Sequence, residues 1–209
     1  PARYQWAAGG YAKVTAANLP TALASVKVRI GLEGNLSPIA AQVRRSQALA
    51  DYYSRHLSPG ASYLFVAQSL LPFLERSGDL GGRAYSVLMT RLPLHLLHRK
   101  LDDLAARFPD RRTFAEFRAP GWMVEAETEA LERAESIITP HGLLAGLYPQ
   151  KTRHLEWKLP ATPAAAQGDS IVFPGPALAR KGAFELREAL AGSDRPLMVL
   201  NNETQEYEH

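Results

Sequence analysis

Two adjacent basic residues, Arg180 and Lys181, are the part of the sequence best suited to hold a charged ligand. They follow an apolar run at residues 171–173 and a loop that contains Gly175, and they lead into a helical pattern over residues 182–191. The start of a helix has free N–H groups and a partial positive charge, which would add to the charge of the two side chains. The segment therefore predicts a diphosphate-binding site formed by Gly175, Arg180 and Lys181, with an ordinary solvated helix start as the alternative.

A second candidate for chemistry is His141, which follows a short apolar run at residues 136–139. A histidine at the end of a strand can hydrogen-bond a sugar or phosphate oxygen, or transfer a proton near neutral pH. We take His141 as the candidate catalytic residue. An ordinary loop or helix-capping histidine is the alternative.

Two other groups of polar residues favour structural interpretations. His95 and His98 lie one helical turn apart, which is a metal-ligand spacing, but no third ligand is evident and two basic residues follow them. We therefore predict a surface pair and no metal site. Five glutamates near helical spacing are predicted to form a solvated helix face: Glu125, Glu127, Glu129, Glu132 and Glu135.

The composition narrows the class of protein. With 209 residues, 46% of them hydrophobic, the chain is long enough to bury a core. The absence of cysteine excludes disulfides and thiolate metal sites, and it favours a cytoplasmic location. No apolar run reaches the roughly 18 residues that a membrane-spanning helix needs.

The basic residues of the chain occur as scattered pairs and not as one patch. Basic pairs at residues 44–45, 99–100 and 111–112 are interpreted as solvated surface, with peripheral contact to the inner membrane face as the alternative. Aromatic and basic residues do not alternate as they do in proteins that bind single-stranded nucleic acid, so we expect no nucleic-acid partner.

Apolar runs alternate with helical patterns along most of the chain. Buried strands are predicted at residues 63–67, 85–89 and 136–139, further strands at 26–30 and 154–157, and helices at 38–57, 70–75, 94–108, 122–135 and 143–148. Such alternation predicts a parallel sheet with helical crossovers, in which ligands bind beyond the carboxyl ends of the strands. The loops after residues 67, 90 and 139 are therefore the ones that matter for function.

A segment rich in proline and alanine divides the pattern. We predict a Rossmann-like parallel-sheet domain over residues 1–160, a linker over residues 161–169, and the beginning of a second Rossmann-like domain over residues 170–209. One βαβ unit of about 40 residues is too short for a complete domain, so we expect this second domain to be incomplete in the sequence.

The segment from residue 171 to residue 190 resembles the first strand, loop and helix of the C-terminal domain of retaining glycosyltransferases with the GT-B fold. In that family an apolar strand leads to Gly-Arg, a short loop, and Lys-Gly before a helix. Lys181-Gly182 matches the Lys-Gly pair, whereas Pro176 stands where the family has arginine, and Arg180 is the candidate substitute. Residues 134–141, with the sequence AESIITPH, resemble the last βα turn of the family's N-terminal domain.

The resemblance implies an α/β protein of the GT-B type that moves a sugar from a nucleotide-diphosphate sugar to an acceptor. The donor diphosphate would lie on Lys181, and no cofactor would be needed besides the donor substrate. Two alternatives stay open. One is a non-catalytic or regulatory module that binds nucleotides or sugars with a degenerate GT-B fold. The other is a different doubly wound enzyme that acts on a sugar phosphate.

Overall fold

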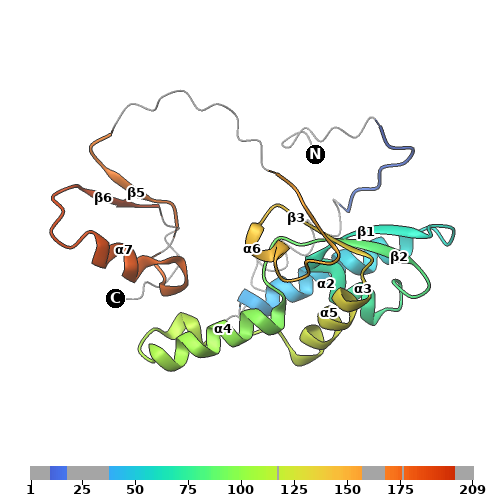
Figure 1. The fold of residues 1–209 in the computed structure, drawn as a ribbon, viewed down its shortest axis with the longest axis horizontal. Helices are drawn as coiled ribbons and strands as arrows, with labels where there is room; N and C mark the ends of the chain where they lie inside the picture. The colour runs from blue at the N-terminus through green and yellow to red at the C-terminus, as the bar shows by residue number, and fades with distance from the viewer. Residues whose placement is uncertain (1–9, 18–37, 117, 157–167, 176, 201–209) are drawn as a thin grey trace.

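A computed structural model describes residues 10–17, 38–116, 118–156, 168–175 and 177–200 (Figure 1). The strand predicted at residues 26–30, most of the predicted linker, and Pro176 lie outside the described residues. The described residues form two parallel sheets, one with four strands and one with two.

The larger sheet has the strand order β1-β2-β3-β4, and every neighbouring pair is parallel. Its strands are β1 (Tyr63–Ala67), β2 (Ala84–Leu88), β3 (Ser136–Thr139) and β4 (Thr152–His154). The helices around it are α2 (Pro38–His56), α3 (Leu71–Arg76), α4 (Leu94–Arg107), α5 (Gly121–Arg133) and α6 (Gly142–Ala145), with short 3-10 turns η1 (Gln68–Leu70) and η2 (Arg112–Phe114). The predicted α/β class with a parallel sheet is confirmed, and the arrangement is consistent with a Rossmann-like fold.

The main core lies between this sheet and helices α3 and α5. Val66, Val87 and Ile137 point from the three strands into it, and Phe73 of α3 and Leu131 of α5 meet them there. Branched residues suit the strand positions because their side chains pack well on a pleated surface. The sheet and the two helices thus hold the carboxyl ends of the strands in fixed positions.

The prediction that β1 is a buried strand is wrong for one of its faces. Tyr63 is 41% exposed and Phe65 68% exposed, while Val66 is buried. Successive residues of a strand point to opposite faces of the sheet, and the core covers the face of β1 that carries Val66. On the exposed side, the Tyr63 hydroxyl lies 2.7 Å from Ser86 Oγ, which lies 2.6 Å from Ser136 Oγ, so hydroxyl groups link the three strands.

The strand predicted at residues 154–157 begins earlier, at Thr152. Lys151 explains the shift, because its ammonium donates to three carbonyl oxygens at the end of α5, those of Leu131, Glu132 and Ala134. This contact places Lys151 beside β3, where its own carbonyl accepts from the backbone N–H of Ile137. Pairing with β3 therefore starts directly after Lys151.

Residues 168–200, here called the second unit, contain β5 (Ile171–Phe173), the 3-10 turn η3 (Ala179–Lys181), α7 (Ala183–Ala189) and β6 (Leu197–Val199). β5 and β6 pair in parallel, as a βαβ unit requires. Helix α7 is shorter than the predicted helix over residues 182–191. Glycines with left-handed backbone explain both ends, since Gly182 has φ +84° and Gly192 has φ +87°.

Candidate functional site

The carboxyl ends of the larger sheet bring together loops that are far apart in the sequence. Ala67 at the end of β1 pairs with Leu88 at the end of β2, and β3 continues the sheet in the same direction. The residues that follow these strands, Gln68, Thr90 and His141, therefore lie along one edge. This edge is where ligands bind in open parallel sheets.

Gln68 ties the loop after β1 to the loop after β2. Its side chain is buried, and its Oε1 accepts from the backbone N–H groups of Thr90 at 3.3 Å and Arg91 at 3.2 Å. Its Nε2 donates to Oε1 of Glu127 at 3.4 Å. One amide side chain thus satisfies two backbone donors of the loop after β2 and fixes that loop.

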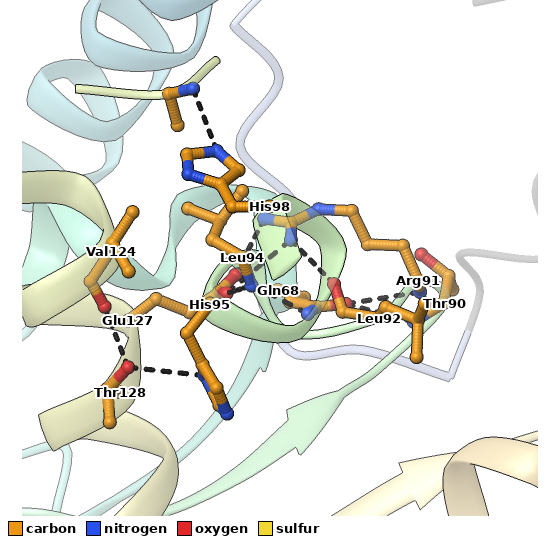
Figure 2. Close-up of polar contacts among 11 residues, drawn as sticks. Gln68, Thr90, Arg91, Leu92, Leu94, His95, His98, Val124, Glu127 and Thr128 are labelled. Carbon is orange, nitrogen blue, oxygen red and sulfur yellow. Dashed lines mark hydrogen bonds and ion pairs between the residues drawn. The ribbon is translucent and has the colours of Figure 1, made fainter. Parts of the chain in front are cut away.

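Glu127 of α5 is the centre of this cluster, and Figure 2 shows it between Arg91 and the first turn of α4. Its carboxylate accepts from Arg91 Nη2 at 2.6 Å and from the backbone N–H of Leu94. Pro93 precedes α4 and offers no capping side chain, so Glu127 caps this helix from a neighbouring one. We call Gln68, Arg91 and Glu127 the Glu127 cluster.

The prediction that Glu127 belongs to a solvated helix face is wrong. Glu127 is 1% exposed, whereas Glu125 and Glu129 on the same helix are exposed. The reason is its position on α5, four residues after Met123 and four before Leu131, both of which face the core. That apolar stripe is visible in the sequence, and a carboxylate on it indicates a buried charge that needs partners.

His141 lies where the sequence places it, directly after β3 and before α6. Its backbone N–H donates to Oγ1 of the buried Thr139 at 3.2 Å, and its carbonyl accepts from the N–H of Ala145 at 3.0 Å. The residue is exposed, and no hydrogen bond engages its ring within the described part of the chain. The backbone is therefore held while the imidazole stays accessible at the edge of the sheet.

His95 and His98 do not form the predicted surface pair. Both are partly buried, and they contact different partners. His98 Nε2 accepts from the backbone N–H of Ala119 at 3.1 Å, while His95 Nδ1 lies 3.5 Å from Oγ1 of Thr128. No group of three or more metal-ligand side chains occurs in the residues that the structure describes.

In the second unit, the loop after β5 carries the other predicted site residues. Gly175 lies in this loop, and Lys181 ends η3 with an exposed side chain. Neither a hydrogen bond nor an ion pair engages the Lys181 ammonium among the described residues. The side chain of Arg180 lies outside what the structure describes.

Three backbone N–H groups at and before the start of α7 are engaged within the turn itself. The N–H of Lys181 donates to the Leu178 carbonyl, that of Gly182 to Ala179, and that of Ala183 to Leu178. The turn before α7 therefore takes up the first N–H group of the helix, that of Ala183, together with the two N–H groups before it. These three N–H groups are not available to an anion bound at this loop.

The contact between the second unit and the first runs through the end of α4 rather than through His141. The Arg111 guanidinium lies 4.2 Å from the ring centroid of Phe108 and 4.1 Å from that of Phe184 in α7, and it pairs with Glu185 at 3.1 Å. Leu101, Phe114 and Ala179 form a small apolar cluster beside it, with Phe184 packed against it. No described hydrogen bond or ion pair joins His141 to the Lys181 loop.

Replacing Arg111 with alanine is expected to loosen this contact without unfolding the core. Two ring contacts and one ion pair would be lost. Glu185 is largely exposed, so most of the effect should come from the ring contacts, and we expect the free energy that stabilises this contact to fall by about 1–2 kcal/mol. Hydrogen exchange should then accelerate about tenfold or more in the peptide containing residues 183–189. Arg107→Ala is the control, since among the described residues its guanidinium lies over one ring, that of Phe108, at 5.4 Å. Equal acceleration in both variants would contradict the prediction.

Comparison of the chain with models of protein families, with curated proteins and with solved structures finds no match. In addition, none of the described helices combines the length and the apolar character needed to span a membrane.

Proposed function

We propose that the protein is a nucleotide-sugar-dependent glycosyltransferase of the GT-B type. The observation that carries the proposal is the succession of two parallel α/β units. The loop after the first strand of the second unit bears an exposed Lys181, whose ammonium has no hydrogen-bond or ion-pair partner among the described residues. That loop lies at the carboxyl end of β5, the ligand-binding edge of a parallel sheet. The succession of strand, loop and helix in residues 171–190 agrees with the resemblance of this segment to the GT-B family.

In this proposal the second unit binds the donor. Transfer breaks the bond between the anomeric carbon of the sugar and the diphosphate oxygen, and it forms a bond to an acceptor oxygen, which loses its proton. The leaving diphosphate gains negative charge, which the ammonium of Lys181 would neutralise. The loop at Gly175 would bring backbone close to the phosphates, because glycine has no side chain to block the approach.

The first unit would hold the acceptor at its own sheet edge. His141 is exposed there, with its backbone fixed by Thr139, and can accept a hydrogen bond or a proton from a sugar hydroxyl. Gln68 and the loop after β2 would line the bottom of this region, because the hydrogen bonds from Thr90 and Arg91 to Gln68 hold the two loops together. Preformed loops of this kind are suited to orient an acceptor.

Lys181→Ala is the variant that tests the proposal. Calorimetric titration of the full-length protein with UDP, GDP and ADP, and with their sugar conjugates, measures binding, and a donor-hydrolysis assay measures turnover. We expect one nucleotide diphosphate to bind, with affinity reduced about tenfold to a hundredfold by Lys181→Ala because one charge-assisted contact is lost. Arg195→Ala is the control, since Arg195 is an exposed basic residue of the same unit.

The same experiment separates the alternatives. Nucleotide binding without donor hydrolysis would favour a regulatory module. Tight binding that survives Lys181→Ala would favour a different doubly wound enzyme that acts on a sugar phosphate. No binding of any nucleotide diphosphate would overturn the glycosyltransferase proposal.

A further inference from the structure

We infer that His98 is an acid-sensitive latch: its hydrogen bond holds the connection between α4 and α5 (residues 108–120) against α4. This connection in turn contacts the second unit, so the latch also affects how that unit is held. Neutral His98 accepts a backbone hydrogen bond from this connection, and protonation of its ring breaks that bond. The inference does not depend on the proposed glycosyltransferase activity. It rests on one hydrogen bond, on the side chains packed around it and on what that segment holds in place.

The hydrogen bond defines the protonation state of His98. Nε2 lies 3.1 Å from the backbone nitrogen of Ala119, and a backbone N–H can only donate. Nε2 must therefore carry a lone pair, which places the single ring proton on Nδ1. In the imidazolium form both ring nitrogens are donors, so His98 cannot keep this contact after protonation.

Within the described ranges, four charged groups face His98 from the surrounding elements. Arg118, in the same connection, donates to the carbonyl oxygen of His98 at 3.3 Å and pairs with Asp102 of α4 at 2.8 Å. Glu127 on α5 and Arg91 after β2 complete the set. Burial, and then Arg118, lower the pKa of His98 from its ordinary value of 6.5, while Asp102 and Glu127 oppose this.

The direction of that shift determines the pH window. Because the folded form disfavours the proton, the unfolded chain binds protons first as the pH falls. The contribution of His98 to stability is complete above pH 6.5. It declines as the pH falls from there toward the lowered pKa of the folded form. The latch is therefore closed at neutral pH and weakens under mildly acidic conditions.

The segment that His98 holds reaches the second unit. Ala119 and Phe114 are both buried, and Arg118 Nη2 donates to the carbonyl of Phe114 at 3.1 Å. Phe114 packs with Leu101 of α4 and with Ala179 of η3. Loss of the bond to His98 would therefore loosen the apolar contact between Phe114 and Ala179. Ala179 begins η3, the turn that ends at Lys181.

His98→Gln is the variant that isolates the latch. A glutamine carbonyl can accept the same N–H hydrogen bond but does not titrate. The variant should therefore show the same hydrogen-exchange protection at both pH values. We would measure hydrogen exchange at about pH 7.5 and pH 5, corrected for the intrinsic pH dependence of exchange. In the wild type, protection of the Ala119 amide and of residues 179–189 should fall at least about tenfold at the lower pH. In His98→Gln it should change less than about twofold.

Two results would overturn the inference. One is an equal loss of protection in the wild type and in His98→Gln, because the acid effect would then come from other groups. The other comes from nitrogen chemical shifts of wild-type His98, which need no variant and remain decisive if His98→Gln does not fold. A ring that carries its proton on Nε2 at about pH 7.5 would rule out the bond to Ala119.

Discussion

Glu127→Ala is expected to lower the free energy of unfolding by about 3 kcal/mol, near the lower end of the range for breaking a buried ion pair. The truncation leaves the N–H of Leu94 without its partner at the start of α4, and it leaves the Arg91 guanidinium without its counter-charge. The Arg91 side chain is 33% exposed, so water compensates part of its loss, which is why we expect no larger value.

Chemical denaturation followed by circular dichroism measures this effect. Glu129→Ala is the matched control, since it removes an exposed carboxylate from the same helix and should change stability by less than about 0.5 kcal/mol. Glu127→Gln keeps the shape and one acceptor oxygen, so a loss of about 1–2 kcal/mol is expected. A loss in Glu127→Ala no greater than that in Glu129→Ala would show that the Glu127 cluster does not stabilise the fold.

Phe73→Ala is expected to destabilise the protein by about 4 kcal/mol. The Phe73 ring is almost fully buried between α3 and the sheet, and it meets the Trp122 ring edge-on with the centroids 5.5 Å apart. Its removal leaves a cavity that the packed strands cannot fill, so the cavity adds to the lost transfer free energy.

Thermal and urea unfolding should both report this loss. Phe65→Ala serves as the comparison, because Phe65 has the same side chain on the exposed face of β1 and should lose less than about 1 kcal/mol. Phe73→Leu should recover most of the stability, since it restores most of the apolar volume. Similar losses for Phe73→Ala and Phe65→Ala would mean that the core is not centred where we place it.

Periodicity in the sequence was sufficient for most of the elements. Strands at residues 63–67 and 136–139 were predicted with the bounds that the structure has, the apolar run at residues 171–173 forms β5, and α4 follows its apolar stripe from Leu94. These predictions held because local patterns reflect which face of an element is buried. The start of β4 was missed because a tertiary contact, that of Lys151 with the end of α5, determines it.

The candidate site was only partly accessible to sequence reasoning. His141 and Lys181 could be placed at strand ends because the order of elements along the chain predicts loop positions in a parallel sheet. The Glu127 cluster could not be assembled, because Gln68, Arg91 and Glu127 come from three separate segments. The hydrogen bonding that occupies the N–H groups before α7 was also missed, since it depends on the left-handed backbone at Gly182.

The sequence by itself determined the α/β class, the succession of strands and helices, and the position of His141 and Lys181 after strands, because these follow from local hydrophobic pattern and turn residues. Only the tertiary structure decided which polar side chains are buried. Glu127 and His98 look like surface residues in the sequence. They become a helix cap and a hydrogen-bond acceptor because neighbouring segments enclose them and leave backbone N–H groups in need of a partner.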